Sequence, residues 1–248
     1  MDALLEHQSL IVNCRNKDGY TPIAFASYFG CYKAVCEILK RDDVDVNSIE
    51  GRMDEDYHDN KIPPSKRSRS QTLAHLLDPN NQSIWEVLYP YVRTSLILAS
   101  WQGKFKVVCE LLKHDKVDVN IGVEYGYTPL ILASCFGRYK VVCELLKHES
   151  VDVNFAVECG YTPLTLASRM EHWDVVWELI KHDKVDLNVQ CKRGYTLLMW
   201  ASLKGKIDVV SELLKRGNLD PDLKNIAGLT ALDVARNCEL TDIREFLF

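Results

Sequence analysis

The residues best suited to chemistry are three histidines at a fixed spacing. His114, His148 and His182 stand in the near-copies KHDKVDVN, KHESVDVN and KHDKVDLN, each 34 residues after the one before. Imidazole nitrogens bind zinc and transfer protons, so the row could mark a metal centre or an active site. A constant spacing fits equally well with one structural role repeated in successive units.

The period itself decides between these roles. A repeat of this length predicts supersecondary units that stack side by side. Equivalent residues in neighbouring packed helices lie about 8 to 10 Å apart, whereas imidazoles that share a zinc ion each approach it to about 2.1 Å. The three histidines therefore cannot share a metal. Each stands in the last turn of a predicted helix, where we expect it to interact with the negative end of the helix dipole.

Other residues that could do chemistry form no catalytic or cofactor motif. The sequence has no GxGxxG, GxxxxGK[ST], HExxH or GxSxG. The segment from Asp43 resembles a calcium loop, but Ser48 stands where that loop requires glycine. None of the nine cysteines forms a CxxC pair, and Cys36, Cys109 and Cys143 recur at one place in the period, which predicts reduced thiols on a buried helix face. We expect no catalytic residue, no cofactor and no metal.

Composition and charge limit the partners. With 47% hydrophobic and 26% charged residues, the 248-residue chain should fold. Its net charge of -5 gives no electrostatic reason to bind nucleic acid or an anionic membrane. No apolar run approaches the roughly 20 residues that span a bilayer, and the N-terminus does not resemble a signal peptide. We expect a cytoplasmic location, with the nucleus left open, and no nucleic-acid or membrane partner.

Each unit contains signals for two short helices and a turn. A threonine recurs every 34 residues, at Thr94, Thr128, Thr162, Thr196 and Thr230. It precedes an apolar block such as TPLILAS, where threonine can cap a helix and proline can begin it. A glycine nine residues later can end that helix in the left-handed conformation. A second block, YKVVCELLKH at 139–148, has apolar residues at helical spacing. We predict two antiparallel helices and an extended turn per unit.

This combination resembles the ankyrin repeat, whose usual period is about 33 residues. The resemblance covers most of the chain and implies an all-α fold, an ankyrin-repeat solenoid of stacked helix–turn–helix units with β-turn fingers. One departure from the family is Glu171, which replaces the helix-ending glycine and predicts either backbone strain or a longer first helix. A second departure is the loss of the family's histidine after Thr-Pro-Leu, which is replaced at Ile97, Ile131, Thr165, Met199 and Asp233.

The repeat divides a single domain, 1–248, into parts. Residues 1–13 match the second half of a unit, 14–47 form a repeat, 88–222 form four regular repeats, and 223–248 form a C-terminal cap. Thr21 and Thr94 are 73 residues apart, which leaves room for one degenerate unit. In this degenerate unit, a polar insert at 48–71 replaces the first helix, because its paired prolines and many charges cannot form a buried helix. Residues 72–87 are a remnant of the repeat. We expect the binding groove to be notched there.

The resemblance also implies where a partner binds. In ankyrin-like units, the end of the inner helix and the residues three and four before the threonine face a concave groove. The units from Thr94 and Thr128 share 20 of 27 residues, and their least conservative differences, Trp101 against Cys135 and Gln102 against Phe136, lie there. The expected partner-binding residues are Tyr28, Phe29, Tyr91, Trp101, Gln102, Glu124, Tyr125, Phe136, Glu158, Arg169, Met170, Lys192, Arg193 and Lys204. Aromatic, Met and Arg side chains of this kind are enriched in interface cores.

These observations predict a non-enzymatic protein–protein interaction module that binds another protein through the concave groove and finger tips. We expect it to be a monomer outside its complex. Two alternatives are a substrate-recruiting adaptor of a ubiquitin ligase or phosphatase complex, and an enzyme that uses the loop at 49–70. Asn47, Asn120 and Asn154 each follow a leucine by eight residues and an acid by two, which is similar to the sequence preferred by an asparagine hydroxylase of animal ankyrin proteins. The resemblance implies hydroxylation at these three residues.

Overall fold

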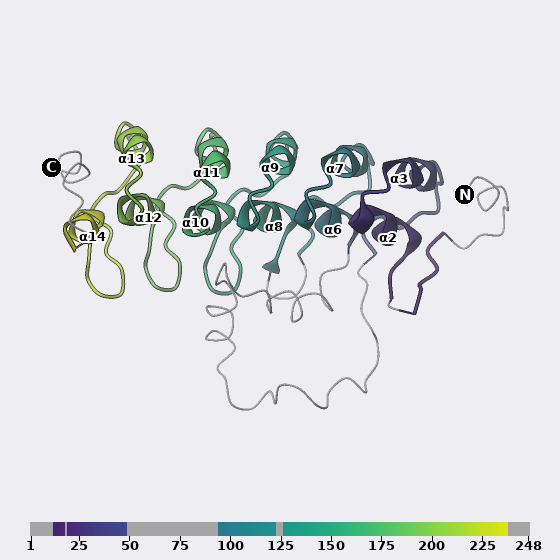
Figure 1. Ribbon diagram of the computed structural model, residues 1–248, viewed down its shortest axis with the longest axis horizontal. Coiled ribbons are helices and arrows are strands. Elements are labelled where there is room, and N and C mark those ends of the chain that lie inside the picture. Colours follow the sequence, from purple (N-terminus) through teal and green to yellow (C-terminus); the bar gives the residue numbers. More distant parts are fainter. Residues whose placement is uncertain (1–11, 18, 49–93, 123–125, 238–248) are drawn as a thin grey trace, which may run out of the picture. The chain divides into compact units, whose positions relative to one another are not determined.

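The computed structural model describes residues 12–17, 19–48, 94–122 and 126–237. The chain forms two compact units, Met1–Glu124 and Tyr125–Phe248. The α-helices of the described ranges form antiparallel pairs, followed by the single helix α14, which confirms the predicted fold class (Figure 1). The first unit contains α2 (Pro22–Phe29), α3 (Tyr32–Leu39), α6 (Ser95–Trp101) and α7 (Phe105–Leu111). The second contains α8 (Pro129–Cys135), α9 (Tyr139–Leu145), α10 (Pro163–Arg169), α11 (Trp173–Ile180), α12 (Leu197–Leu203), α13 (Ile207–Leu214) and α14 (Ala231–Asn237).

The predicted helix signals act as expected. The Thr128 hydroxyl accepts a hydrogen bond from the Ile131 amide at 3.3 Å, and Pro129 begins α8. Thr21, Thr94, Thr162 and Thr196 cap their helices in the same way. A left-handed glycine follows four of these inner helices, with φ of 62° at Gly137, and Glu171 takes that place after α10. Threonine therefore begins the inner helix of each repeat, and a left-handed residue ends it.

The backbone conformation of Glu171 decides between the two alternatives predicted for it, backbone strain or a longer first helix. Its φ is 62°, and no other non-glycine residue in the described ranges has a positive φ. The helix before it, α10, ends at Arg169, the same place in the period at which α8 and α12 end. The glutamate therefore adopts the conformation that favours glycine, and the strained alternative is the correct one. Its carboxylate is paired with Lys204, at 2.6 Å from Nζ.

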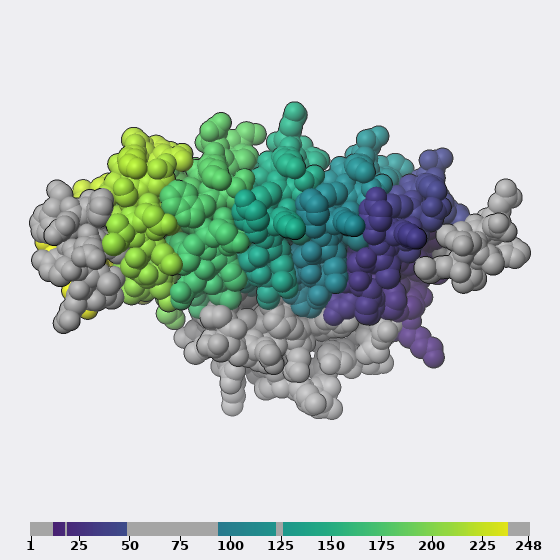
Figure 2. All heavy atoms as spheres, turned by 45° about the horizontal axis from the view of Figure 1, so that its top comes forward, coloured from purple at the N-terminus to yellow at the C-terminus, as the bar shows by residue number. Residues whose placement is uncertain are grey.

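The core of each unit lies between successive helix pairs. In the second unit, α10 packs on α8, α12 on α10 and α14 on α12, while α11 packs on α9. Leu132, Leu166 and Leu198 of the inner helices are almost completely buried. Within this unit, Figure 2 shows the side chains of one repeat in direct contact with those of the next.

The repeats on either side of residues 49–93 contact each other directly. In the first unit, α2 packs on α6 and α3 on α7. The Asn47 side chain donates to the Lys116 carbonyl at 2.6 Å and accepts from the Asp118 amide at 2.9 Å. The notch that we expected between these repeats is therefore wrong, because 14–47 and 94–120 stack as neighbours. Nearly all of the predicted insert at 48–71 and the remnant at 72–87 lie outside the described residues, so their structure stays a prediction.

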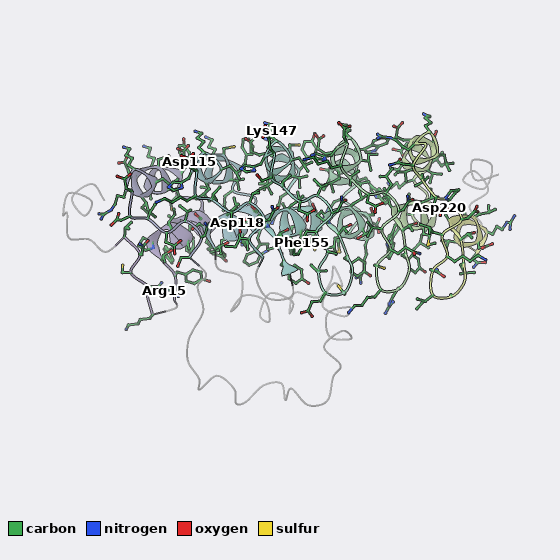
Figure 3. All side chains as sticks on the ribbon, turned by 180° about the vertical axis from the view of Figure 1, so that it is seen from behind. Arg15, Asp115, Asp118, Lys147, Phe155 and Asp220 are labelled. Atoms are coloured by element: carbon green, nitrogen blue, oxygen red, sulfur yellow. The ribbon has the colours of Figure 1, made fainter. Side chains whose placement is uncertain are left out.

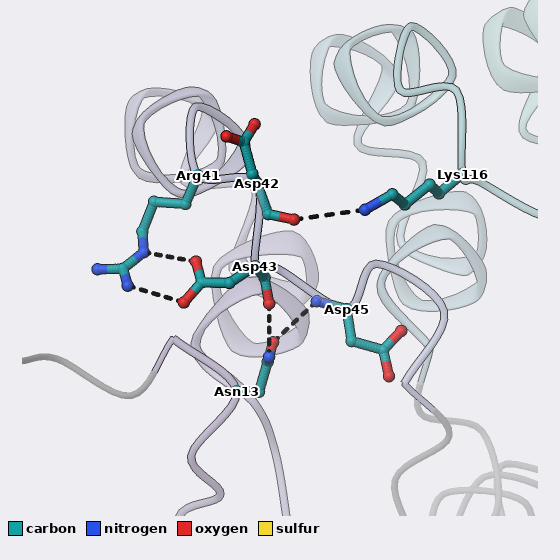
Figure 4. Close-up of polar contacts among 6 residues, drawn as sticks. All are labelled: Asn13, Arg41, Asp42, Asp43, Asp45 and Lys116. Carbon is teal, nitrogen blue, oxygen red and sulfur yellow. Dashed lines mark hydrogen bonds and ion pairs between the residues drawn. The ribbon is translucent and has the colours of Figure 1, made fainter.

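An asparagine side chain links each finger to the next repeat. Figure 4 shows the first such link, in which Asn13 donates to the Asp43 carbonyl at 2.7 Å and accepts from the Asp45 amide at 2.8 Å. Asn154 and Asn188 make the same pair of bonds in the second unit. In the first unit, Asp118, which belongs to this ladder, lies at the level of the inner helices, whereas Arg15 lies lower, in a finger (Figure 3). The ladder therefore fixes the base of the fingers.

A buried serine recurs at one place on the inner helices α2, α6, α8, α10 and α12, and its environment differs among repeats. Ser134 is fully buried, and its hydroxyl has no hydrogen-bond partner within the described part of the chain. Ser168, at the same place in the period, donates to the Leu164 carbonyl at 2.7 Å. We expect Ser134→Ala to raise the free energy of unfolding by about 1 kcal/mol, because it removes an unsatisfied buried hydroxyl. Ser168→Ala should lower it by about 1 kcal/mol. Urea unfolding of both variants tests this, and a loss of stability in Ser134→Ala would contradict it.

Candidate protein-binding surfaces

The histidine row has a structural role. Nδ1 of His114 accepts a hydrogen bond from the Lys116 amide at 3.3 Å, and His148 and His182 make the same contact two residues ahead. Each of these hydrogen bonds closes the turn that follows an outer helix. The three histidines lie beyond the ends of α7, α9 and α11, so the expected place in the last turn of a helix is wrong. In the described ranges, no three His, Cys, Asp or Glu side chains gather closely enough to hold a metal ion.

The first unit has an aromatic cluster, which consists of Phe25, Tyr28, Phe29 and Trp101 and exposes two of its rings. The Phe29 ring lies 4.7 Å from that of Phe25 and 5.0 Å from that of Tyr28, and Tyr28 lies 5.9 Å from Trp101. Phe25 and Phe29 are 49% and 55% exposed. Large aromatic side chains that remain this exposed are typical of protein-binding surfaces.

Trp101 differs from the expectation, because only 8% of it is exposed. It ends α6, which packs against α2, and the half-buried Tyr28 contacts its ring. The contact with Tyr28 across the two stacked repeats contributes to its burial. Gln102 is half-buried beside it. Tyr91, Glu124 and Tyr125 lie outside the described residues, and their place in a binding surface stays a prediction.

In the second unit, the ends of the inner helices carry fewer aromatic and more basic side chains than in the first unit. Phe136 and Met170 are half-buried, and the Arg138 guanidinium lies 5.9 Å from the Phe136 ring. The Arg169 guanidinium lies 5.2 Å from the ring of Tyr161. These distances fit cation–π contacts, which hold the side chains of neighbouring groove positions in place.

The fingers of the second unit lie side by side. The Lys192 amide donates to the Cys159 carbonyl at 3.1 Å, and the Ile226 amide donates to the Arg193 carbonyl at 3.2 Å. The expected residues Glu158, Lys192 and Arg193 are exposed there, and so is Lys204 at the end of α12. The structure thus brings Lys192 and Arg193 together with the following finger.

Two exposed apolar residues were missed from the sequence. Ile226 is 77% exposed and lies four residues before Thr230, so the position rule applied to the earlier units would have found it. Phe25 lies four residues after Thr21, where the next repeats have the buried leucines Leu98 and Leu132. An apolar residue at a core position carries no sequence signal of exposure.

The recurring cysteines are less buried than predicted. Cys36, Cys109 and Cys143 are half-buried, because their helix position lies at the edge of the core. Cys135 is buried, and desolvation raises the pKa of its thiol to about 12. We expect a thiol-specific reagent at neutral pH to modify the exposed Cys14 and leave Cys135 unmodified in the folded protein, since the thiolate is the reactive form. Peptide mass mapping checks this, and equal labelling of both would contradict it.

Two of the three candidate hydroxylation sites, Asn47 and Asn154, take part in the ladder. The side-chain amides of Asn47 and Asn154 each donate to and accept from the backbone of the next repeat. Asn120, at the same place in the period, also has a polar contact. Hydroxylation of the three asparagines stays a prediction.

Comparisons with known proteins agree with this geometry. A family model described as ankyrin repeats (3 copies) matches residues 66–156, 96–191 and 141–225. The crystal structure of EF0377, an ankyrin repeat protein, superposes with a TM-score of 0.69 at 22% identity, and the match covers 91% of this chain and 96% of that one. No curated protein matches the sequence. None of the described helices has the length and apolar composition needed to cross a bilayer.

Proposed function

The chain belongs to the ankyrin repeat family, and from this premise we propose that it is a non-enzymatic module that binds another protein through the inner-helix ends and the fingers. Ankyrin repeats generally serve as protein–protein interaction modules and are typically without catalytic activity. An adaptor role in a larger complex, a monomeric state outside it, and a cytoplasmic or nuclear location are finer predictions. Co-purification, sedimentation and imaging test them.

The observation that carries this proposal is the exposure of Phe29 at the end of α2. More than half of this side chain, 55%, is open to solvent, although two aromatic rings pack against it. Exposed phenylalanine on a rigid support loses little conformational entropy on binding and buries a large apolar area. Such residues are favourable anchors for a partner.

Capture of the partner from the cells that make this protein tests the proposal. The immobilised wild type is compared with Phe29→Ala and with the control Tyr32→Ala. Tyr32 is also an exposed aromatic residue, at 39%, but it begins the outer helix α3. We expect Phe29→Ala to reduce partner retention at least about tenfold and Tyr32→Ala to leave it unchanged. Circular dichroism should be unaltered in both.

Equal retention by all three proteins would contradict binding at this surface. A loss with Tyr32→Ala alone would place the partner on the outer helices instead. Turnover of a substrate by the purified protein would contradict the non-enzymatic assignment.

A further inference from the structure

Two neighbouring fingers of the second unit carry a local positive charge in an acidic chain. These basic fingers are residues 189–195, VQCKRGY, and 223–229, LKNIAGL. Together they contain Lys192, Arg193 and Lys224 and no acidic residue, whereas the whole chain has a net charge of -5. All three cations are exposed, and none of them forms an ion pair with another described residue. The charges of Lys192 and Arg193 are therefore available to a ligand, whereas Lys224 also interacts electrostatically with Asp233 and follows the exposed Asp222 by two residues.

The basic fingers are held together by backbone contacts. The Ile226 amide donates to the Arg193 carbonyl at 3.2 Å. The Gln190 side chain donates to the carbonyls of Gly194 and Lys224, at 2.9 and 3.0 Å. A Cβ atom at Gly194 would lie 2.6 Å from the Asn225 Cα, so the two loops are in backbone contact at this point. Little ordering of the loops is thus needed when a ligand binds.

The surroundings of these cations define the kind of ligand. Ile226 is 77% exposed on the same pair of loops and offers an apolar contact. Glu158 is exposed on the preceding finger, where it repels negative charge. A nucleic acid needs an extended basic surface, which three cations next to Glu158 do not provide. A short acidic segment of a protein, with one apolar side chain, matches both the charge and the exposed isoleucine.

We propose that the basic fingers bind an acidic, extended segment of the partner protein. The Arg193 guanidinium pairs with a carboxylate, Lys192 and Lys224 contact further carboxylates, and an apolar side chain of the segment covers Ile226. This inference rests on the proposed function and names the chemistry of its partner.

Fluorescence anisotropy with synthetic peptides tests the inference on the full chain. The probe is a labelled peptide of Glu, Asp and Gly with one central Leu. Two matched peptides replace the acids by Gln and Asn, or the Leu by Ser. We expect the acidic Leu peptide to bind, and its affinity to fall about tenfold when Leu is lost or in the variant Ile226→Ser. The peptide in which Gln and Asn replace the acidic residues should not bind.

Charge-reversed variants localise the contact. Lys192→Glu with Arg193→Glu should weaken binding of the acidic peptide at least about tenfold. The control is Lys140→Glu with Lys184→Glu, which makes the same change in net charge at two exposed lysines outside the groove and fingers. We expect the control to bind as the wild type does. Circular dichroism of both verifies folding.

Three outcomes would overturn the inference: no binding of the acidic peptide, equal weakening in both charge-reversed variants, or tighter binding of a single-stranded oligonucleotide than of the peptide. None of them bears on Phe29, which lies in the other compact unit. Failure here would leave the proposed function standing, and loss of partner retention in Phe29→Ala would support that function independently.

Discussion

We expect Gly194→Ala to lower the free energy of unfolding of the second compact unit by about 3 kcal/mol. Gly194 has a φ of 75°, which costs an alanine about 1 kcal/mol. The new Cβ would also lie 2.6 Å from the Asn225 Cα and 3.0 Å from the Ile226 amide nitrogen. Backbone atoms cannot move aside as the end of a flexible side chain can, so overpacking adds about 2 kcal/mol.

Gly205→Ala is the matched control for this result. Gly205 has a φ of 68°, but a Cβ atom there would meet nothing within 4 Å. It should therefore show only the conformational cost of about 1 kcal/mol. Urea unfolding followed by circular dichroism measures both variants. Equal destabilisation by the two would show that the fingers do not touch at Gly194.

Asn154→Ala should destabilise the second unit by about 2 kcal/mol. Its side chain donates to the Lys184 carbonyl and accepts from the Asp186 amide, both at 2.8 Å. Each hydrogen bond contributes about 1 kcal/mol, and both cross from one repeat to the next. Because repeat proteins depend on such nearest-neighbour contacts, we also expect unfolding to become less cooperative.

Asn218→Ala provides the comparison for Asn154→Ala. Asn218 is exposed and contributes its backbone carbonyl to the ladder, which alanine retains. We expect its free energy of unfolding to stay within about 0.5 kcal/mol of the wild type. Thermal unfolding of the two variants side by side measures the difference. Similar melting temperatures would mean that the asparagine side chains add nothing to stacking.

Local features of this fold were predictable because their signals lie within a few residues of one another. Thr128 and Pro129 determine where α8 begins, and Gly137 follows its end. The strain at Glu171 was also one of two alternatives that its type and position allowed. The 34-residue period extended these local predictions to the other repeats.

Contacts between repeats were not predictable in the same way. Counting residues placed a degenerate unit between 14–47 and 94–120, whereas α2 packs directly on α6. Trp101, which the repeat alignment had placed in an open groove, is buried. Periodicity shows which residues are equivalent, but it does not show which repeats touch when a segment lies between them. Side-chain exposure at the candidate surfaces depends on those contacts.

Hydrogen exchange of the protein alone and with its captured partner tests the central claim most directly. Backbone amides exchange more slowly where a partner covers the structure or stabilises it locally. We predict added protection at the ends of the inner helices, above all around Phe29, and in the fingers. Protection confined to the outer helices α3, α7, α9, α11 and α13, with the inner-helix ends and fingers unchanged, would contradict the account.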